Sequence, residues 1–312
     1  MAKVLITPRS FAAHSQAPYE LLKEAGIEVV ANPVRGILTK KDMLTHMKEV
    51  DGVILGVDPL DADVLAVAKN LSVVAKYGVG TDNIDLDYCQ AHNIDVKITR
   101  NANSDAVSDY AFALMLAVAR RVVEIDKCCR TNDWSKKVAN DVYGKKLGIL
   151  GLGAIGKGVA KRAIGFNMEL YAYDVTYDEK FMTEHNILQA SVETILAECD
   201  FISLHLPLTP KTKHLINAKS LASSKENLII INTARGEIIN ESDLYNALKN
   251  GKIYGAGVDV FEVEPANNSR LLTLDNVIVG SHCAASTIDA VNMMSSMAAN
   301  NVIEALKKRG KL

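Results

Sequence analysis

Short apolar runs alternate with amphipathic segments through the first hundred residues of the chain. A short continuous apolar run is typical of a buried strand, whereas apolar residues spaced by one helical turn indicate a helix. By this criterion strands are predicted at residues 4–6, 28–30, 52–55, 71–75 and 96–98, with helices between them such as 19–25 and 62–69. Strands that alternate with helices predict a parallel sheet flanked by helices.

The same alternation begins again at Lys145. Strands are predicted at residues 147–150, 169–173, 201–204, 228–231, 255–258 and 277–279, separated by helical segments that include 192–197 and 241–249. This second half predicts a doubly wound parallel sheet. The fold expected for the chain is therefore α/β, with two doubly wound, Rossmann-like domains.

Two long segments with helical spacing stand apart from these units. Residues 105–130 are apolar over most faces of the expected helix, which indicates burial between domains or against another subunit. Trp134 follows in a polar, loop-like setting and favours a subunit contact, so a homodimer is expected. Residues 290–308 are expected to form a helix that packs back on the first domain.

Composition and charge narrow the class of protein. The chain has 312 residues, enough for two domains on a prior of about 150 residues each. Its formal net charge is -2, with no long run of either sign, so a nucleic-acid-binding surface is not expected. An anionic substrate would have to be bound by individual basic side chains in its site.

The cysteines and the amino terminus bear on the cellular setting. The five cysteines contain no CxxC pair, so neither a disulfide framework nor a zinc or other metal site is expected. No signal peptide is recognisable, and the apolar stretch 111–119 is shorter than the about 20 residues that span a bilayer. We expect a cytoplasmic protein without a membrane partner.

A glycine-rich turn follows the predicted strand 147–150 and reads Gly151-Leu152-Gly153-Ala154-Ile155-Gly156. In a dinucleotide site the first glycine permits the turn, the second lets the pyrophosphate approach the backbone, and the third allows close helix packing. The amides and positive dipole of the helix N-terminus then bind the phosphates. Such turns are common, so the motif depends on its context.

That context is an acidic residue at the end of the next strand. Asp174 lies about 20 residues beyond the motif, where a carboxylate accepts hydrogen bonds from ribose hydroxyls. No arginine among residues 175–177 could hold a 2′-phosphate, so NAD is predicted rather than NADP. The alternative is a structural turn with an unrelated surface aspartate.

Three further segments offer groups for oxidation of a hydroxy acid. This reaction needs a base for the hydroxyl proton, a cation for the carboxylate and 2-oxygen, and a carboxylate that holds the base. Residues 232–236, 259–265 and 280–282 each follow a predicted strand and contain Arg235, Glu264 and His282. Carboxyl ends of strands face one crevice in an open α/β sheet, so these groups are expected to lie together.

At these segments the chain resembles the D-2-hydroxyacid dehydrogenase family, and in particular its D-3-phosphoglycerate dehydrogenase branch. The resemblance extends over nearly the whole chain and includes residues 77–85 and 103–107 as well as the glycine motif. It implies a substrate domain built from residues 1–99 and 285–312, with an NAD domain at 100–284 inserted between them. The helix between the domains would also serve dimerisation.

The resemblance also implies roles for single residues. Arg235 looks like the substrate-orienting arginine, His282 like the acid/base, and Glu264 like its carboxylate partner. Asp259 resembles the residue that holds the nicotinamide carboxamide, and the amides of Gly78, Val79 and Gly80 would bind the substrate carboxylate. Further cofactor contacts are expected at His205, Pro207, Thr233 and Ala234, with Arg235 and His282 also facing the cofactor.

Each member of the trio has an ordinary structural alternative. Arg235 could cap a helix or lie on the surface, Glu264 could be a solvated loop residue, and His282 could be an interior histidine. The spacing of all three together is what favours a catalytic site.

The chain departs from the phosphoglycerate branch at residues 56–59, where that branch typically carries a phosphate-binding arginine. Here the segment contains Asp58, which does not suit a phosphate. Arg9, after the first strand, is predicted to replace the missing arginine, and Arg100 is a second candidate. Because no extension follows Leu312, the regulatory serine-binding domain of some relatives is not expected. Glu264 in place of glutamine makes the formate-oxidising branch less suitable.

The predicted function is hydride transfer between NAD and a small anionic D-2-hydroxy acid or its 2-keto acid. The leading substrate is 3-phosphoglycerate, which would place the protein in serine biosynthesis. One alternative is a general 2-keto acid reductase of the D-lactate, glycerate or hydroxyisocaproate type. Another is a non-catalytic protein that senses NAD on the same fold.

Overall fold

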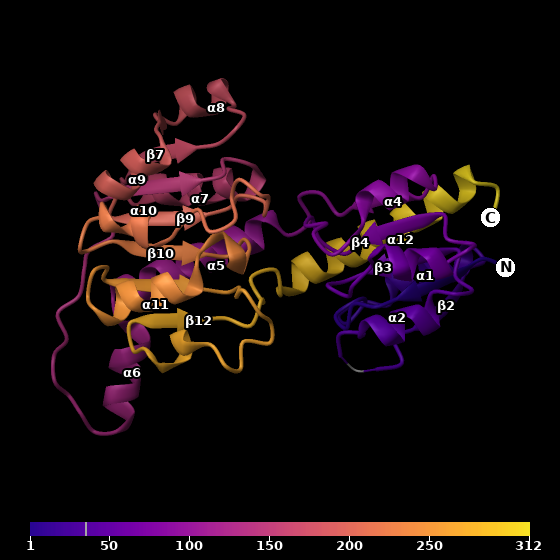
Figure 1. Cartoon of the computed structure of the whole chain (residues 1–312), viewed down its shortest axis with the longest axis horizontal. Helices are drawn as coiled ribbons and strands as arrows, with labels where there is room; N and C mark the ends of the chain where they lie inside the picture. The colour runs from indigo at the N-terminus through magenta and orange to yellow at the C-terminus, as the bar shows by residue number, and fades with distance from the viewer. Residues whose placement is uncertain (35) are drawn as a thin grey trace. The chain divides into compact units, whose positions relative to one another are not determined.

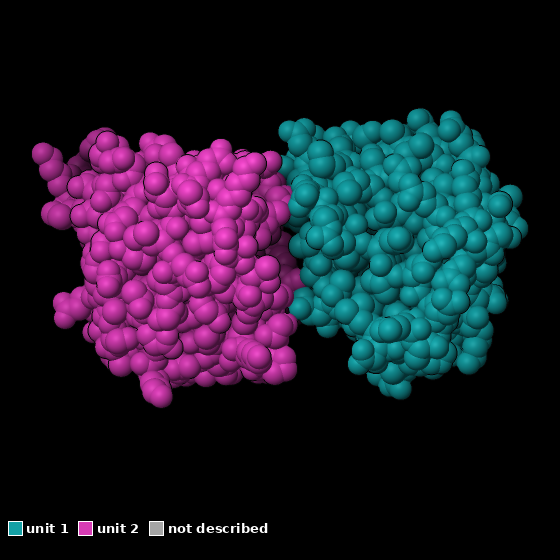
Figure 2. All heavy atoms as spheres, turned by 90° about the horizontal axis from the view of Figure 1, so that it is seen from above, with its two compact units in different colours: residues 1–103, 285–312 teal, residues 104–284 magenta. Residues whose placement is uncertain are grey.

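The chain folds into two compact units, which Figure 2 shows in different colours. A computed structural model describes residues 1–34 and 36–312. Residues 1–103 and 285–312 form unit 1, and residues 104–284 form unit 2. The sequence-based boundary lay between residues 99 and 100, whereas the chain passes from unit 1 to unit 2 between Asn103 and Ser104.

Unit 1 is built on a parallel sheet of five strands in the order β2-β1-β3-β4-β5. The strands are β1 (Lys3–Ile6), β2 (Glu28–Ala31), β3 (Gly52–Leu55), β4 (Val73–Lys76) and β5 (Asp95–Ile98). The helices are α1 (Ala17–Glu24), α2 (Lys40–His46), α3 (Ala62–Val67), α4 (Leu86–Ala91) and α12 (Ile288–Lys308). As predicted, the C-terminal helix α12 packs back on this unit, against α1, β3, β4 and β5 (Figure 1).

Unit 2 contains a parallel sheet of seven strands in the order β12-β11-β10-β9-β6-β7-β8. The strands are β6 (Lys146–Leu150), β7 (Glu169–Tyr173), β8 (Leu188–Gln189), β9 (Phe201–Leu204), β10 (Ile229–Asn232), β11 (Gly255–Val258) and β12 (Val277–Val279). The helices are α5 (Ser104–Ala119), α6 (Val122–Arg130), α7 (Ala154–Gly165), α8 (Glu179–Glu184), α9 (Val192–Glu198), α10 (Ala218–Ala222) and α11 (Glu241–Lys249), with short 3₁₀ helices η1 (Gly236–Ile238) and η2 (Arg270–Thr273).

The predicted α/β fold with two parallel sheets is confirmed. Strands β9, β10 and β11 are fully buried and consist almost entirely of apolar residues, as strands covered on both faces must be. The strand order of unit 2 reverses at β6, which has β9 on one side and β7 on the other. Ligands of such sheets bind outside the carboxyl ends of the strands at this switch point.

The predicted single helix over residues 105–130 is wrong, because the chain breaks between α5 and α6. Arg121 adopts a left-handed conformation with φ 54° and separates the two helices. Helix α5 packs against β10, β11 and α7 of its own unit. Helix α6, which the structure describes in full, has no buried residue. The apolar pattern of residues 105–130 therefore reflects burial over α5 but not over α6.

The described residues contain neither a membrane-spanning helix nor a cluster of metal-binding side chains. Among residues 1–34 and 36–312 no helix is both long and apolar enough to cross a bilayer. Over the same residues, no group of three or more His, Cys, Asp or Glu side chains is arranged to hold a metal ion.

Asp58 has a structural position that its sequence context did not reveal. Its side chain is buried, and its carboxylate accepts a hydrogen bond of 2.7 Å from the Leu38 amide and another from the Thr7 hydroxyl. Thr7 in turn accepts a hydrogen bond of 2.9 Å from the Gly56 amide. Asp58 therefore joins the loops after β1 and β3 to the segment before α2, and its charge is directed into the protein.

We predict that Asp58→Ala destabilises the protein. The substitution leaves the buried Leu38 amide and Thr7 hydroxyl without their acceptor, which costs about 3 kcal/mol of unfolding free energy. Urea denaturation would measure the loss. The exposed Asp87, replaced in the same way, is the matched control and should leave the denaturation midpoint unchanged. Equal midpoints for both variants would contradict this account of Asp58.

Candidate functional site in unit 2

The glycine turn after β6 combines two packed glycines with one that faces open space. Gly151 has φ 101°, and a Cβ there would lie 2.6 Å from the His205 carbonyl carbon. A Cβ on Gly156 would lie 2.0 Å from the Gly151 carbonyl oxygen. Gly153 caps the N-terminus of α7, and a Cβ built there would meet no atom within 4 Å. Packing thus requires glycine at 151 and 156, while glycine at 153 leaves space beside the helix N-terminus.

Unpartnered polar atoms lie at the ends of strands near this turn. Over the described residues of unit 2, His205 Nδ1 after β9 and Thr233 Oγ1 after β10 are buried without a hydrogen-bond partner. The other ring nitrogen of His205 lies 2.8 Å from Ser203 Oγ. Burial lowers the pKa of His205 to about 3, so its ring is neutral. Buried polar atoms normally find partners, and these two suit a polar ligand at the carboxyl edge of the sheet.

Asp174 is fastened to the same turn. Its Oδ2 atom accepts a hydrogen bond of 2.6 Å from the Leu152 amide, and its Oδ1 atom accepts one of 2.7 Å from the Val175 amide. The side chain remains half-buried beside the glycine turn. Open space at Gly153, helix amides, unpartnered polar atoms and a neighbouring carboxylate together fit a dinucleotide that runs across the edge of the sheet.

Arg235 lies in a turn that is held together by hydrogen bonds to the Asn232 side chain. Asn232 is buried at the end of β10; its Oδ1 atom accepts a hydrogen bond from the Ala234 amide at 3.1 Å, and its Nδ2 atom donates to the Arg235 carbonyl at 2.9 Å. A Cβ on Gly236 would lie only 1.9 Å from the Phe261 carbonyl carbon. The turn is therefore pressed against the loop after β11. Sequence reasoning missed Asn232, although a polar residue that closes an apolar strand is the signal that could have found it.

Glu264 and His282 form a direct pair. His282 Nδ1 lies 2.8 Å from Glu264 Oε2, and Glu264 Oε1 accepts a hydrogen bond of 3.0 Å from the Phe261 amide. Burial by itself would raise the pKa of Glu264. The hydrogen bond and charge of His282, the Phe261 amide and the charge of Arg235 outweigh it, so this pKa lies below its ordinary value. The carboxylate is ionised at neutral pH, and Arg235 is near enough to contribute.

His282 itself adopts an uncommon backbone conformation. Its φ of 56° lies in the left-handed region, which costs a residue with a side chain about 1–2 kcal/mol. The two following amides, of Cys283 and Ala284, donate to the buried carboxylate of Asp259 at 3.0 and 2.8 Å. Both oxygens of Asp259 thus accept backbone hydrogen bonds. The expected contact between Asp259 and a nicotinamide carboxamide stays a prediction.

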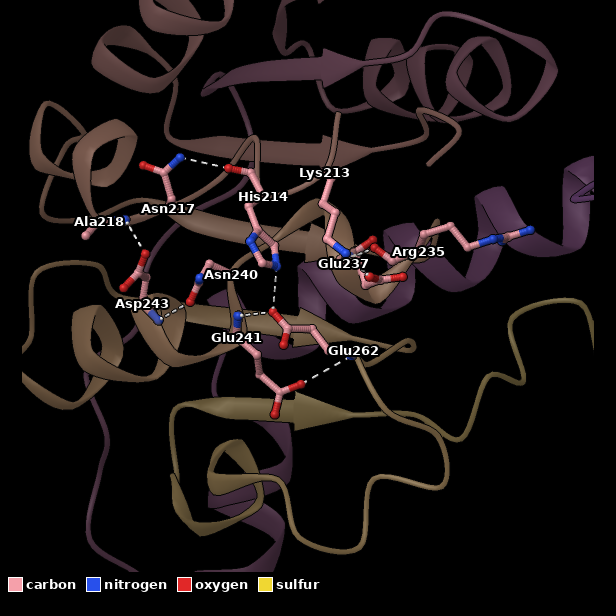
Figure 3. Close-up of polar contacts among 11 residues, drawn as sticks. Lys213, His214, Asn217, Ala218, Arg235, Glu237, Asn240, Glu241, Asp243 and Glu262 are labelled. Atoms are coloured by element: carbon pink, nitrogen blue, oxygen red, sulfur yellow. Dashed lines mark hydrogen bonds and ion pairs between the residues drawn. The ribbon is translucent and has the colours of Figure 1, made fainter. Parts of the chain in front are cut away.

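A polar network supports the loops that carry Arg235 and Glu264 (Figure 3). Glu262 Oε1 accepts a hydrogen bond of 2.9 Å from the Glu241 amide and lies 3.1 Å from His214 Nε2. The Glu262 amide donates to Glu241 in return, at 3.4 Å. In Figure 3 the Arg235 side chain points away from this network. The loop after β11 is thus tied to the start of α11.

The predicted substrate-binding residues of unit 1 differ in their exposure and in their hydrogen bonds. Gly78 has φ 128°, but its amide donates a hydrogen bond of 2.9 Å to Thr99 Oγ1. In this structure the Gly78 amide is thus used by Thr99, and the binding of a substrate carboxylate by Gly78, Val79 and Gly80 stays a prediction. Arg9 and Arg100 are both exposed. These residues belong to unit 1, whereas Arg235, Glu264 and His282 come together within unit 2.

Comparison with known proteins identifies relatives along the whole chain. Residues 112–284, more than half of the chain, match the family described as D-isomer specific 2-hydroxyacid dehydrogenase, NAD binding domain. A glyoxylate reductase of Korarchaeum cryptofilum is 40% identical over 88% of this chain and 84% of its own length. A D-3-phosphoglycerate dehydrogenase of Methanocaldococcus jannaschii is 37% identical over 98% of this chain, which covers 58% of that protein.

A solved structure has the same fold. The D-lactate dehydrogenase of Aquifex aeolicus, in complex with NAD and lactic acid, superposes with a TM-score of 0.87 at 27% identity, over 99% of this chain and 97% of that one. Relatives from Thermococcus litoralis, Pyrococcus horikoshii and Pyrococcus furiosus are also named glyoxylate reductase.

We predict that Gly153→Ala weakens NADH binding without destabilising the protein. The added methyl would occupy the open space beside the N-terminus of α7, and Gly153 has an ordinary φ of -73°. The dissociation constant of NADH, measured by fluorescence titration, should rise about tenfold or more.

Gly165→Ala, at the other end of α7 and also in open space, is the matched control. It should bind NADH as the unmodified protein does. If Gly153→Ala binds NADH equally well, the dinucleotide does not pass this glycine.

Proposed function

The chain belongs to the D-isomer-specific 2-hydroxyacid dehydrogenase family, and we propose that it reduces a small unphosphorylated 2-keto acid such as glyoxylate. As a member it is an oxidoreductase that uses a nicotinamide cofactor, and the predicted family, enzyme class and cofactor are thereby confirmed. The proposal rests on one observation above all. The His282–Glu264 pair, 2.8 Å apart, lies with Arg235 at the same sheet edge as the glycine turn.

The proposed roles follow from the chemistry of these side chains. Glu264 is an acceptor, so His282 carries a proton on Nδ1 and presents Nε2 to the substrate. When protonated on Nε2, His282 donates that proton to the 2-oxygen of the keto acid; in the reverse direction it removes the proton from the hydroxyl. Glu264 stabilises the imidazolium form. Bound NADH supplies the hydride that reaches C2.

Arg235 would neutralise the substrate carboxylate and polarise the 2-oxygen. Its turn is held by Asn232 and by the close approach of Gly236 to Phe261. The amides of Val79 and Gly80 would give the carboxylate further donors, since successive backbone amides suit an anion. Unit 1 would then be the substrate domain, and unit 2 the NAD domain.

We propose NAD rather than NADP as the physiological cofactor. The carboxylate of Asp174 is held beside the glycine turn by the Leu152 and Val175 amides. An anion there can accept hydrogen bonds from ribose hydroxyls and repels a 2′-phosphate. No arginine occurs among the next three residues to counter that repulsion.

A second candidate substrate is 3-phosphoglycerate, with a place in serine biosynthesis. It is favoured by the exposed Arg9 at the end of β1 and by the relative from Methanocaldococcus jannaschii. The several relatives named glyoxylate reductase favour an unphosphorylated substrate instead.

We also propose a homodimer in which α6 is covered. Val122 and Val123 on α6 are exposed, although the helix carries a distinct apolar face. Trp134, shortly after this helix, is 80% exposed. Apolar side chains that remain exposed on a helix commonly mark an interface between subunits.

We predict turnover of glyoxylate, hydroxypyruvate or pyruvate with NADH, followed by the loss of absorbance of the reduced cofactor. His282→Ala should lower kcat by roughly 10²- to 10⁴-fold, the usual contribution of general acid–base catalysis. Turnover confined to 3-phosphohydroxypyruvate, and weakened by Arg9→Ala, would support the second candidate instead. NADH binding without turnover of any acid would contradict an enzymatic role and indicate an NAD sensor.

We predict that Glu264→Gln lowers kcat for keto-acid reduction, by no more than the roughly 10²- to 10⁴-fold that general acid–base catalysis contributes, and moves its pH profile to lower pH. The glutamine still contacts Nδ1, but no longer stabilises the protonated imidazole that donates the proton. The pKa of Glu264 lies below its ordinary value, so its carboxylate is ionised at neutral pH. The stabilising interaction of this carboxylate with His282 is therefore lost only at acidic pH, where Glu264 takes up a proton. The exposed Glu226→Gln is the control, and an unshifted profile in Glu264→Gln would exclude this role.

A further inference from the structure

A second histidine–carboxylate pair includes the loop after β11, beside the candidate catalytic pair. His214 Nε2 lies 3.1 Å from Glu262 Oε1, and Glu262 precedes Glu264 by two residues. In Figure 3 the His214 imidazole points toward the Glu262 carboxylate from the loop after β9. The proposed reaction does not use this pair, which joins the loop of Glu264 to a segment distant along the chain.

The backbone of His214 is held by the loop after β10. Its amide donates to the Glu237 carbonyl at 2.7 Å, and its own carbonyl accepts a hydrogen bond of 2.7 Å from Asn217 Nδ2. Two residues on, the Ile216 amide donates to the Ile238 carbonyl at 3.1 Å. His214 has φ 52°, a left-handed conformation that is uncommon for a residue with a side chain. These hydrogen bonds keep the backbone in that conformation, so the imidazole starts from a fixed position.

The same segment reaches back to Pro207, a predicted cofactor contact. The Thr212 hydroxyl donates to the Pro207 carbonyl at 2.7 Å. The next residue, Lys213, places its Nζ atom 2.7 Å from Glu237 Oε1 in the loop after β10. The segment that presents the histidine is therefore tied both to the predicted cofactor side and to the neighbouring loop.

We propose that His214 is a positioning residue for the candidate catalytic pair. Through its contact with Glu262 it fixes the loop after β11, and with it Glu264, to the loop after β9. The proposal rests on the proposed function, in which Glu264 is the partner of the acid/base His282. It assigns to His214 an action through Glu262 and not on the reacting atoms.

The position of Glu262 matters for Glu264 because the backbone between them is short and already in use. Phe261 directly precedes Glu262, and its amide donates to Glu264 Oε1 at 3.0 Å. A Cβ on Gly236 would lie 1.9 Å from the Phe261 carbonyl carbon and 2.5 Å from the Glu262 amide nitrogen, so the loop after β10 packs against this peptide. A shift of Glu262 would therefore move the amide that orients Glu264.

The contact with His214 restrains a side chain that burial alone does not fix. The Glu262 side chain is 33% exposed, and its Oε1 atom faces both the Glu241 amide, at 2.9 Å, and His214 Nε2. Hydrogen bonds to a carboxylate are stronger than those between neutral groups, so the imidazole adds a substantial restraint. A displacement of about 1 Å between catalytic groups can cost roughly 10²-fold in rate. A contact that limits movement of this loop therefore affects catalysis.

His214→Asn tests the proposal, because asparagine adopts the left-handed conformation readily but its side chain is too short to reach Glu262. We expect kcat for a 2-keto acid that the unmodified enzyme reduces to fall about tenfold, with the dissociation constant of NADH nearly unchanged. The reductive pH profile should also move to lower pH, because a displaced Glu264 stabilises the protonated His282 less. A loss of stability alone would not move that profile.

Two matched variants accompany it. His214→Gln keeps an N–H donor at nearly the same reach and should retain kcat within about twofold. His185→Asn makes the same change at another histidine of unit 2, beside Phe181, and should alter neither kcat nor the pH profile. Equal losses in His214→Gln and His214→Asn would overturn the proposal, because the donor to Glu262 would then not matter.

A second background separates this proposal from the proposed function. In Glu264→Gln, the added change His214→Asn should lower the residual rate by less than about twofold, because its effect acts through Glu264. An unchanged kcat in His214→Asn, with or without a raised dissociation constant of NADH, would overturn the proposal and leave the proposed function intact. Full activity in His282→Ala would instead overturn the proposed function.

Glu262→Asp provides a further variant if His214→Asn does not fold. It keeps the charge but withdraws the carboxylate from His214 by one methylene group. We expect kcat to fall and the pH profile to move in the same direction, with NADH binding unchanged. An unchanged kcat and pH profile in Glu262→Asp would overturn the proposal.

Discussion

The loops after β10, β11 and β12 approach one another so closely that two positions have no room for a Cβ atom. At Gly236 such an atom would lie 1.9 Å from the Phe261 carbonyl carbon, and at Gly280 it would lie 2.1 Å from the Asp259 carboxylate. Each contact joins one loop to the next along the sheet. Because the three loops carry Arg235, Glu264 and His282, this close approach sets the spacing of the candidate catalytic groups.

Two carboxylates from the same loop have different surroundings. Asp259 is buried, and its carboxylate accepts hydrogen bonds from the backbone amides of Cys283 and Ala284. Glu264 lies five residues further along the loop, is only partly buried, and pairs with an imidazole that can change its charge. A fixed amide network suits a scaffold, whereas a titrating partner suits proton transfer.

Close backbone contacts also shape the predicted cofactor site of unit 2. Gly151 packs against the backbone of His205 after β9, and Gly156 packs against the Gly151 carbonyl, whereas Gly153 at the N-terminus of α7 faces open space. His205 Nδ1 and Thr233 Oγ1, which follow β9 and β10, are buried without a hydrogen-bond partner among the described residues. Packing on one side of the turn is thus accompanied by unpartnered polar atoms at the carboxyl edge of the sheet.

Much of the fold was readable from the sequence, because buried parallel strands are continuous apolar runs and need no long-range information to be seen. The glycine motif, Asp174 and the trio were predicted in the same way, from residue types at the ends of predicted strands. The break at Arg121 was not predictable, since α5 is buried by unit 2 whereas the apolar residues of α6 remain exposed.

Only the tertiary structure decided which polar groups serve the fold and which remain available for chemistry. Asp58 and Asp259 are both aspartates that follow a strand, and both proved to accept buried hydrogen bonds within the protein. The Gly78 amide, predicted to bind substrate, donates a hydrogen bond to Thr99 Oγ1 within its own unit. Sequence spacing places a group at the edge of a sheet, but hydrogen-bond partners come from segments distant along the chain. That is why residue types predicted the kind of chemistry, while contacts between loops determined which atoms can perform it.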